Sequence, residues 1–240
     1  MKIFPAIDLS DGKCVRLLKG EKGTETVFSE NPVEQARLWE ACGASNLHVV
    51  DLDGAFTGRP GNLEVIKEIV NSTSSKVQVG GGIRDIDAIK RYIDLGVTRI
   101  IMGTSAFKDP ELLEVACRRY PGRIAVGIDT RSGKVAIKGW TETINSGLGE
   151  LLDKFHKIGV SMIIHTDIDR DGTLSGINTE SLQKFLGLSK IPVIASGGIS
   201  TTDDLEKLET IKSGYLYGAI LGKSIYTGSI ELKSAIDRFE

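Results

Sequence analysis

The sequence predicts a single (β/α)8 TIM barrel built from two homologous (β/α)4 half-barrels. Three observations support this fold class. Short β-rich runs alternate with amphipathic helical stretches through all 240 residues, eight such runs occur, and residues of the first half return at a fixed distance in the second. An internal repeat of this kind sets the architecture. We therefore expect one domain over residues 1–240, with half-barrel repeats of about 1–122 and 123–240.

The repeat is clearest at two glycine pairs. Gly81 and Gly82 return as Gly197 and Gly198, 116 residues later. Such a repeat predicts a ligand that carries a phosphate at each end and reacts between two carboxylates. Further matching pairs are Asp51 and Asp167, Asp53 and Asp169, and Asn62 and Asn178 at the same distance, with Asp8 and Asp129 separated by 121 residues.

Eight runs are strand candidates, and several are apolar almost throughout, as in residues 191–195. Strands buried on both faces, as parallel strands are, have this composition. A doubly wound open sheet is the alternative, but it would not naturally place four matching strand ends around one mouth. The candidates are residues 3–8, 46–51, 76–80, 99–103, 124–129, 161–167, 191–196 and 216–222.

The helices between these runs have recognisable ends. A proline directly follows two of the expected N-caps, as is common at the first helical position, and Gly96 would end the helix that begins near residue 85. Two long connections, 12–31 and 130–147, occupy equivalent places in the halves, and loops of this length are often lids or binding loops. The expected N-caps are Asn31, Asn62, Asp85, Asp109 and Asn178.

Composition excludes several classes of function. The net charge is −2, with 30 basic and 32 acidic residues interleaved, so no basic block favours nucleic acid. No apolar run approaches the ~18 residues of a membrane span. The three separated cysteines suit packing in a reduced protein, and the three histidines do not suggest a metal site. We expect a cytoplasmic monomer, with a weak homodimer as the alternative, and no metal.

Four glycine clusters fall at predicted strand ends, which is where (β/α)8 barrels place their active sites. Glycine lets the backbone approach a phosphate, and the helix that follows offers unpaired N–H groups. Ordinary turn chemistry is the alternative, and Arg84 and Lys223 could instead be solvated residues at helix starts. The predicted phosphate-binding residues are Gly81, Gly82, Arg84, Gly103, Thr104, Ser196, Gly197, Gly198, Gly222 and Lys223.

Asp8 and Asp129 each end an apolar strand, and the repeat places them across the barrel mouth from one another. Two carboxylates about a substrate's width apart suit general acid–base catalysis; capping of the following loops is the alternative. The halves also differ, because Thr166 and Asp171 match Val50 and Ala55, and Trp140 has no counterpart. Bonds should therefore change at one end of the ligand. His48 could reach that ligand from within the barrel or be a packed core residue.

Five segments together resemble one family, the phosphoribosylformimino-aminoimidazole carboxamide ribotide isomerases of histidine biosynthesis. The resemblance covers essentially the whole chain. It implies a barrel that converts an aminoaldose, phosphorylated at both ends, into an aminoketose by an Amadori rearrangement. The nitrogen of this small-molecule substrate acts as the electron sink, so neither a metal nor an organic cofactor is expected. The segments are Pro5–Leu9, Gly12–Leu17, Gly80–Arg84, Gly139–Trp140 and Thr166–Gly176.

The resemblance also implies roles for individual residues. Asp8 is the general base and Asp129 its acid partner, while Asp171 matches a carboxylate that some members use for proton donation. Thr166 would orient a carboxylate or bind ligand, and Trp140 would stack on an aromatic or sugar portion as its loop closes. The other predicted substrate-binding residues are Arg16, His48, Gly172 and Gly176.

Three alternatives remain beside this family. The cyclase subunit of imidazole glycerol phosphate synthase usually has lysine where Arg16 stands and serine where Asp167 stands. The bifunctional isomerase that also acts on phosphoribosyl anthranilate typically has serine in place of Gly80 and arginine in place of Lys138. A phosphate-binding scaffold without activity would have no physical need for the paired carboxylates. The sequence therefore favours the isomerase of a single pathway.

Overall fold

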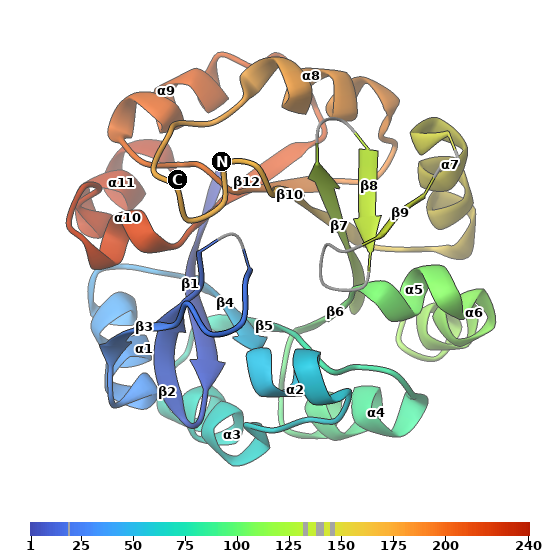
Figure 1. Ribbon diagram of the computed structural model, residues 1–240, viewed down its shortest axis with the longest axis horizontal. Helices are drawn as coiled ribbons and strands as arrows, with labels where there is room; N and C mark the ends of the chain where they lie inside the picture. The colour runs from blue at the N-terminus through green and yellow to red at the C-terminus, as the bar shows by residue number, and fades with distance from the viewer. Residues whose placement is uncertain (19, 132–133, 138–141, 145–146) are drawn as a thin grey trace.

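The computed structural model describes residues 1–240 apart from 19, 132–133, 138–141 and 145–146. Parallel strands lie at the centre of the molecule and helices surround them (Figure 1). The barrel strands are β1 (Lys2–Ser10), β4 (Asn46–Asp51), β5 (Lys76–Gly80), β6 (Arg99–Met102), β7 (Ile124–Arg131), β10 (Met162–Asp167), β11 (Val193–Ser196) and β12 (Leu216–Leu221).

The sheet closes on itself, because β1 pairs in parallel with β4 on one side and with β12 on the other. The register between β1 and β12 places Phe4 beside Ile220, and the parallel pairing of β7 with β10 completes the ring. The two predicted halves meet where β6 pairs with β7 and where β12 pairs with β1. All eight predicted strands are therefore confirmed, and the open doubly wound sheet is excluded. In Figure 1 the first half of the chain, blue to green, occupies one side of the barrel and the second half the other.

The helices begin at most of the predicted residues. Asn31 accepts hydrogen bonds from the backbone N–H groups of Val33 and Glu34, and Asp85, Asp109 and Asn178 cap in the same way. The helices are α1 (Pro32–Ala41), α2 (Leu52–Thr57), α3 (Leu63–Ser72), α4 (Ile86–Asp94), α5 (Thr104–Lys108), α6 (Pro110–Arg119), α7 (Leu148–Ile158), α8 (Thr179–Leu188), α9 (Thr202–Glu209), α10 (Lys223–Tyr226) and α11 (Leu232–Phe239).

Asn62 departs from its predicted role. It lies at the N-cap position of α3, but its side chain makes no capping hydrogen bond. Its amide nitrogen donates instead to Asp51 Oδ1 over 2.7 Å and to Asp53 Oδ2 over 2.8 Å. Asp51 is fully buried, and a buried carboxylate is costly without hydrogen-bond donors.

The two long connections contain regular structure. Strand β1 continues into an antiparallel hairpin of β2 (Lys13–Arg16) and β3 (Thr26–Ser29), and β7 continues into β8 (Lys134–Ile137) and β9 (Glu142–Ile144). The connections 12–31 and 130–147, which were expected to be lids or binding loops, thus contain hairpin strands in their described residues. Strands β1 and β7 are the longest of the barrel, so their free ends offer backbone groups to which a hairpin can pair.

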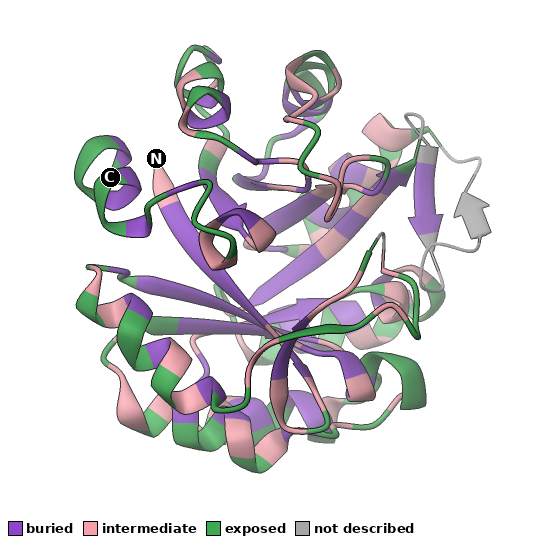
Figure 2. Ribbon diagram, turned by 60° about the vertical axis from the view of Figure 1, so that its left-hand side comes forward, coloured by how far each residue is buried: buried purple, intermediate pink, exposed green. Residues whose placement is uncertain are grey.

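Apolar residues fill two regions, which follow from the alternation of side chains along each strand. A large cluster lies between the strands and the helices, and the strands are buried while the helices bury one side only (Figure 2). Cys14 and Cys117 are buried, and burial raises the pKa of both thiols to about 11. None of the helices described is long and apolar enough to cross a membrane. The smaller cluster, inside the barrel, comprises Phe4, Ala6, Ile101, Ala125, Met162, Ile164, Ile194 and Ile220.

Candidate active site

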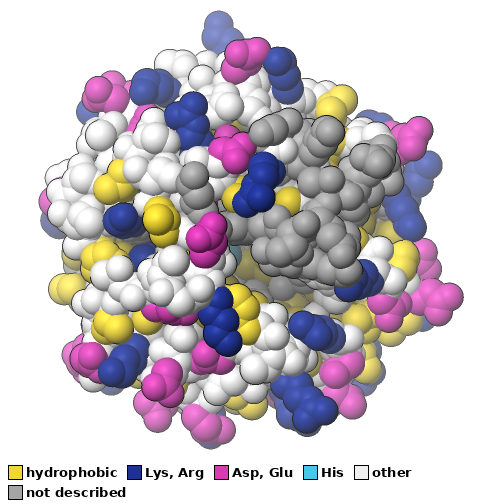
Figure 3. All heavy atoms as spheres, in the orientation of Figure 1, with side chains coloured by type: hydrophobic (Ala, Val, Ile, Leu, Met, Phe, Trp, Pro, Cys, Tyr) yellow, Lys and Arg dark blue, Asp and Glu magenta, His cyan; other side chains and the backbone are white. Residues whose placement is uncertain are grey.

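A cavity of about 370 Å³ opens at the carboxyl ends of the barrel strands. Charged side chains of both signs are scattered over the face seen in Figure 3 rather than gathered into one patch. Trp140 lies outside the described residues, and Gly176 is not part of the cavity wall. The predicted site residues that line the cavity are Asp8, Arg16, His48, Gly81, Gly82, Arg84, Gly103, Thr104, Asp129, Thr166, Asp171, Gly172, Ser196, Gly197, Gly198, Gly222 and Lys223.

The side chains of Asp8 and Arg16 form an ion pair at the mouth of the barrel. The antiparallel pairing of β1 with β2 sets Asp8 opposite Val15. Arg16, the next residue along β2, therefore lies close to Asp8. Its Nη1 donates to Asp8 Oδ2 over 2.6 Å and its Nη2 to the carbonyl of Ala6 over 2.5 Å. Burial raises the pKa of Asp8, and the nearby guanidinium offsets only part of this effect.

The turn between β1 and β2 is held by residues from the next loop of the barrel. Asp11 and Gly12 have φ of 49° and 72°, which is the geometry of a two-residue hairpin turn. The Asp53 carboxylate accepts from the Asp11 backbone N–H over 2.7 Å and from the Ser10 hydroxyl over 3.2 Å. Asn62 Oδ1 accepts from the Gly12 N–H over 3.0 Å. The repeat had singled out Asp53 and Asn62, but only their contacts reveal this role.

Asp171 follows β10 in a turn in which its backbone N–H donates to the carbonyl of Asp167 over 3.0 Å. The pKa of Asp171 is raised to about 6, mainly by burial; the Arg16 charge acts to lower it, and the carboxylates of Asp8 and Asp129 act to raise it. Asp171 therefore lies close enough to both other carboxylates to be affected by their charges. A carboxyl with this pKa can both hold and release a proton near neutral pH.

Asp129 and Thr166 lie side by side on β7 and β10, because the register of these strands pairs the two residues. Both line the cavity, so the sequence prediction that Thr166 belongs with the carboxylates agrees with its position. The next residue along β7, Thr130, points elsewhere. Its hydroxyl lies 3.1 Å from Nε2 of the buried His165.

The first glycine cradle is formed by Gly81 and Gly82 after β5, and both glycines have positive φ, 104° and 69°. A Cβ on Gly81 would lie 2.1 Å from the Asp51 carbonyl oxygen, and one on Gly82 would lie 2.6 Å from the backbone of Gly54. Only glycine fits here. The buried Asp51 carboxylate supports this loop, because it accepts from the backbone N–H groups of Gly54, Gly61 and Asn62.

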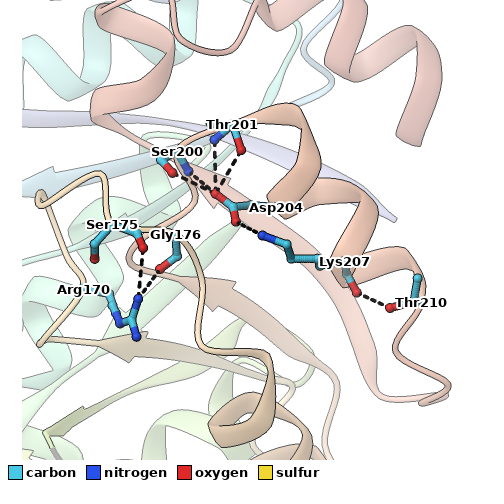
Figure 4. A network of polar contacts seen from close by, with 8 residues as sticks. All are labelled: Arg170, Ser175, Gly176, Ser200, Thr201, Asp204, Lys207 and Thr210. Carbon is cyan, nitrogen blue, oxygen red and sulfur yellow. Dashed lines mark hydrogen bonds and ion pairs between the residues drawn. The ribbon is translucent and has the colours of Figure 1, made fainter.

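The second cradle repeats this construction after β11. A Cβ on Gly197, which has φ of 89°, would lie 2.6 Å from the carbonyl oxygen of Asp167. One on Gly198, with φ of 84°, would lie 2.6 Å from that of Gly176. Gly176 therefore lies directly behind Gly198, and its predicted contact with the ligand stays a prediction. Its carbonyl also accepts from Arg170 Nη1 over 3.3 Å (Figure 4).

Asp204 holds the chain that leaves the second cradle. Its Oδ2 accepts from the Ser200 backbone N–H over 3.0 Å, the Ser200 hydroxyl over 2.8 Å and the Thr201 backbone N–H over 3.2 Å. Its Oδ1 accepts from Lys207 over 3.0 Å (Figure 4). Burial alone would raise the pKa of Asp204, but these hydrogen bonds lower it to about 2. The sequence had not singled out this residue.

Two cations lie at the cradles. Lys223 is half-buried, and its Nζ donates to the carbonyl of Gly172 over 3.2 Å. Arg84 is exposed, yet it still lines the cavity, with its guanidinium against Gly58. Arg84 can therefore be a solvated residue near a helix start and still present its charge to the cavity. Among the residues that the structure describes, no group of three or more histidine, cysteine or acidic side chains is placed to hold a metal ion.

His48 combines both of its predicted alternatives. It is buried, with 8% of its surface exposed, and it also lines the cavity. Its Nδ1 lies 2.9 Å from Nε2 of Gln78. Burial and, to a smaller extent, the positive charge of Arg16 lower the pKa of the imidazole to about 3. The ring is therefore neutral at physiological pH.

Comparison with known proteins places the chain in a family. The model of the histidine biosynthesis protein family matches residues 2–231. A Synechocystis protein named 1-(5-phosphoribosyl)-5-((5-phosphoribosylamino)methylideneamino)imidazole-4-carboxamide isomerase is 51% identical over 236 residues, which are 98% of this chain and 92% of that protein. Proteins of the same name from Trichlorobacter lovleyi and Geobacter sulfurreducens are each 50% identical, covering 99% and 98% of this chain and 97% of each relative. The chain therefore belongs to the histidine biosynthesis protein family and, within it, to the imidazole-4-carboxamide isomerases that these relatives represent.

Proposed function

We propose that this protein is an intramolecular aldose–ketose isomerase of histidine biosynthesis. Its reaction is the Amadori rearrangement of the aminoaldose N′-((5′-phosphoribosyl)formimino)-5-aminoimidazole-4-carboxamide ribotide to the phosphoribulosyl aminoketose. The observation that carries this proposal is one cavity that contains Asp8, Asp129 and Asp171 between two glycine cradles. The names of the relatives point to the same substrate.

The two phosphates of this substrate would bind at the two cradles. At each cradle a pair of glycines with positive φ brings backbone to the cavity wall without side chains in the way. Arg84 adds positive charge on one side of the cavity and Lys223 on the other. The reacting sugar, between the phosphates, then lies against the three carboxylates.

The reaction needs one acid and one base. A carboxylic acid protonates the ribose ring oxygen, the C1–O bond breaks, and the lone pair of the substrate nitrogen forms an iminium. A carboxylate then removes the C2 proton, and the electrons of that C–H bond form the C1–C2 double bond and neutralise the nitrogen. Loss of the enol proton and protonation of C1 give the ketone. Electrons and atoms balance within the substrate.

The structure suggests how the carboxyls share these steps. Asp8 is the base in this proposal, because the Arg16 ion pair favours its charged form. Burial also raises the pKa of Asp8, which makes it a stronger base than an exposed aspartate. The acid is Asp129 or Asp171; the pKa of Asp171, raised by burial to about 6, suits a proton donor. Thr166 would orient Asp129 or the sugar from the neighbouring strand.

Turnover measurements on two substrates test the proposal. Purified protein should convert the histidine-pathway aminoaldose, followed spectrophotometrically, and should act far more slowly on phosphoribosyl anthranilate. Comparable rates on both would contradict single-pathway activity and favour the bifunctional isomerase. Turnover of neither would contradict the isomerase proposal itself. The Asp8→Asn variant is the control that attributes any observed rate to this cavity.

We also propose that the chain functions as a monomer in the cytoplasm, with a weak homodimer as the alternative for its assembly. All the carboxylates and both cradles belong to one chain, so a second copy is not needed to complete the site. The free cysteines suit a reducing compartment. Light scattering of the purified protein should give a mass near 25.9 kDa.

A further inference from the structure

Three polar side chains form a chain through the interior of the barrel. Arg99 on β6, Gln78 on β5 and His48 on β4 are paired in register across neighbouring strands. Arg99 Nη1 donates to Gln78 Oε1 over 2.8 Å, and Gln78 Nε2 lies 2.9 Å from His48 Nδ1. Gln78 is 1% exposed, so these two contacts determine how its amide is oriented.

The chemistry of the groups fixes the direction of each hydrogen bond. A guanidinium can only donate, so the Gln78 oxygen must face Arg99. The Gln78 amide nitrogen then faces His48, and this nitrogen also only donates. His48 Nδ1 must therefore be the unprotonated acceptor. Since the buried ring is neutral, its one proton resides on Nε2.

The donor that results is available to a ligand. His48 lines the cavity, and its Nδ1 is already occupied by Gln78, which leaves the Nε2–H group. The pairing of Ala6 with His48, and of Asp8 with Val50, places His48 at a deeper level of the barrel than the Asp8 carboxylate. In the proposed binding mode the substrate sugar lies between the two phosphates, nearer to the barrel mouth than His48. An oxygen of this sugar is the acceptor for the Nε2–H group.

The matching positions in the second half of the chain are apolar. The residues 116 positions after His48 and Gln78 are Ile164 and Ile194. Both are buried in the apolar cluster inside the barrel. The chain of Arg99, Gln78 and His48 therefore breaks the two-fold symmetry of the repeat. A donor that recognises only one end of a nearly symmetric ligand requires such an asymmetry.

We propose that Gln78 and Arg99 are positioning residues that hold His48 as a neutral Nε2–H donor to an oxygen of the substrate sugar. The identity of this substrate rests on the proposed function. The tautomer of His48 does not, because it follows from contacts within the protein. The two parts can therefore be tested separately.

The tautomer is measured first. Long-range ¹H–¹⁵N correlation spectra of the ¹⁵N-labelled protein report which ring nitrogen of each histidine carries the proton. The chain has only three histidines, and the exposed His156→Gln variant identifies one set of signals without disturbing the barrel. We expect His48 to be protonated on Nε2 and to stay neutral from pH 8 to 5. Protonation on Nδ1, or a charged ring at pH 7, would overturn the proposal.

Gln78→Glu provides the decisive variant. A glutamate accepts from Arg99 and also from His48, so the proton should move to Nδ1 and turn Nε2 into an acceptor. Gln78→Met keeps the size of the side chain but favours neither tautomer. Thermal unfolding of both variants shows whether the barrel remains intact. A merely structural role of Gln78 would change stability in both variants without reversing the tautomer in either.

Kinetics then test the contact with substrate. Loss of one hydrogen bond should lower kcat/KM by about 3- to 10-fold in Gln78→Glu, with a smaller loss in Gln78→Met. A reversed tautomer with unchanged kcat/KM would show that His48 does not donate to the substrate. If the wild-type protein does not turn over the aminoaldose at all, the proposed function fails, while the wild-type tautomer still confirms or overturns the role of Gln78 and Arg99.

Discussion

Arg16 Nη1 lies 2.6 Å from Asp8 Oδ2, so the carboxylate proposed as the catalytic base is already paired before substrate binds. Both side chains are largely buried, with 14% and 15% of their surface exposed. Arg16 reaches this place only because the β1–β2 hairpin turns back over the barrel mouth. The hairpin therefore contributes a residue to the active site.

Removal of the Arg16 charge should make Asp8 harder to ionise. In Arg16→Met the buried carboxylate keeps its desolvation but loses its cation, so its pKa should rise. Because the base must be ionised, the acidic limb of the kcat/KM profile should move to higher pH, by about 1 to 3 pH units. Arg16→Lys keeps the charge and should move the limb less. An unchanged limb in Arg16→Met would show that Asp8 is not the group that must be ionised.

Replacement of Asp8 or Asp129 by asparagine should remove proton transfer while it preserves shape. We expect kcat to fall by about 10²- to 10⁴-fold in each variant, the usual contribution of general acid–base catalysis. Product affinity, measured by calorimetry, should remain near the wild-type value because the cradles are unchanged. Near-normal turnover in both variants would exclude these residues from the mechanism.

The pH profile can identify the acid. Burial raises the pKa of Asp171 to about 6, so its protonated fraction falls as pH rises through 6. If Asp171 donates the proton, kcat/KM should decline above that pH, and Asp171→Asn should abolish this decline together with most of the rate. If kcat/KM falls in Asp129→Asn alone, and the pH profile of kcat/KM is unchanged in Asp171→Asn, the acid is Asp129.

A carboxylate placed beside the first cradle, at the predicted phosphate-binding residue Gly103 after β6, should weaken phosphate binding. Gly103 is suitable, because a Cβ there would meet nothing within 4 Å. Gly103→Asp should raise KM by about tenfold or more through like-charge repulsion, and the uncharged Gly103→Ala should raise it much less. Aspartate at Gly82 or Gly198 would be a poorer test, since its Cβ would clash with backbone. Equal KM values for the two Gly103 variants would argue against a phosphate at this cradle.

Asp204 should make stability depend on acid pH. Its pKa is lowered to about 2 in the folded protein from 3.8 when unfolded, so its contribution is complete above pH 4 and is lost as pH falls towards 2. This shift corresponds to about 2 kcal/mol of unfolding free energy at pH 7. Asp204→Asn should lose about that amount in denaturant titrations and flatten the dependence between pH 4 and 2. The exposed neighbour Asp203→Asn changes the same charge and should have little effect; equal losses in both would contradict the prediction.

Much of the fold could be predicted because its signals are local or periodic. Apolar runs mark buried strands wherever they pair, and an asparagine or aspartate before a helix usually caps it. The repeated glycines were predicted for the same reason. A positive φ after β5 and β11 requires glycine at Gly81, Gly82, Gly197 and Gly198 whatever lies around them. The strand-end carboxylates followed from the same repeat.

Only the closed barrel decides which polar groups meet. Asp53 and Asn62 reach the turn at Gly12 across 42 to 50 residues of sequence, and Gln78 reaches His48 across 30. No local sequence pattern encodes these pairs, because the strand register determines which polar groups lie within hydrogen-bonding distance of one another. Asn62 shows the consequence, because its sequence predicts a helix cap while its surroundings make it a donor to Asp51. The sequence alone thus determined the barrel and the glycines and carboxylates expected at its mouth, whereas the charge and tautomer of those residues depend on desolvation and on contacts that exist only after the strands close.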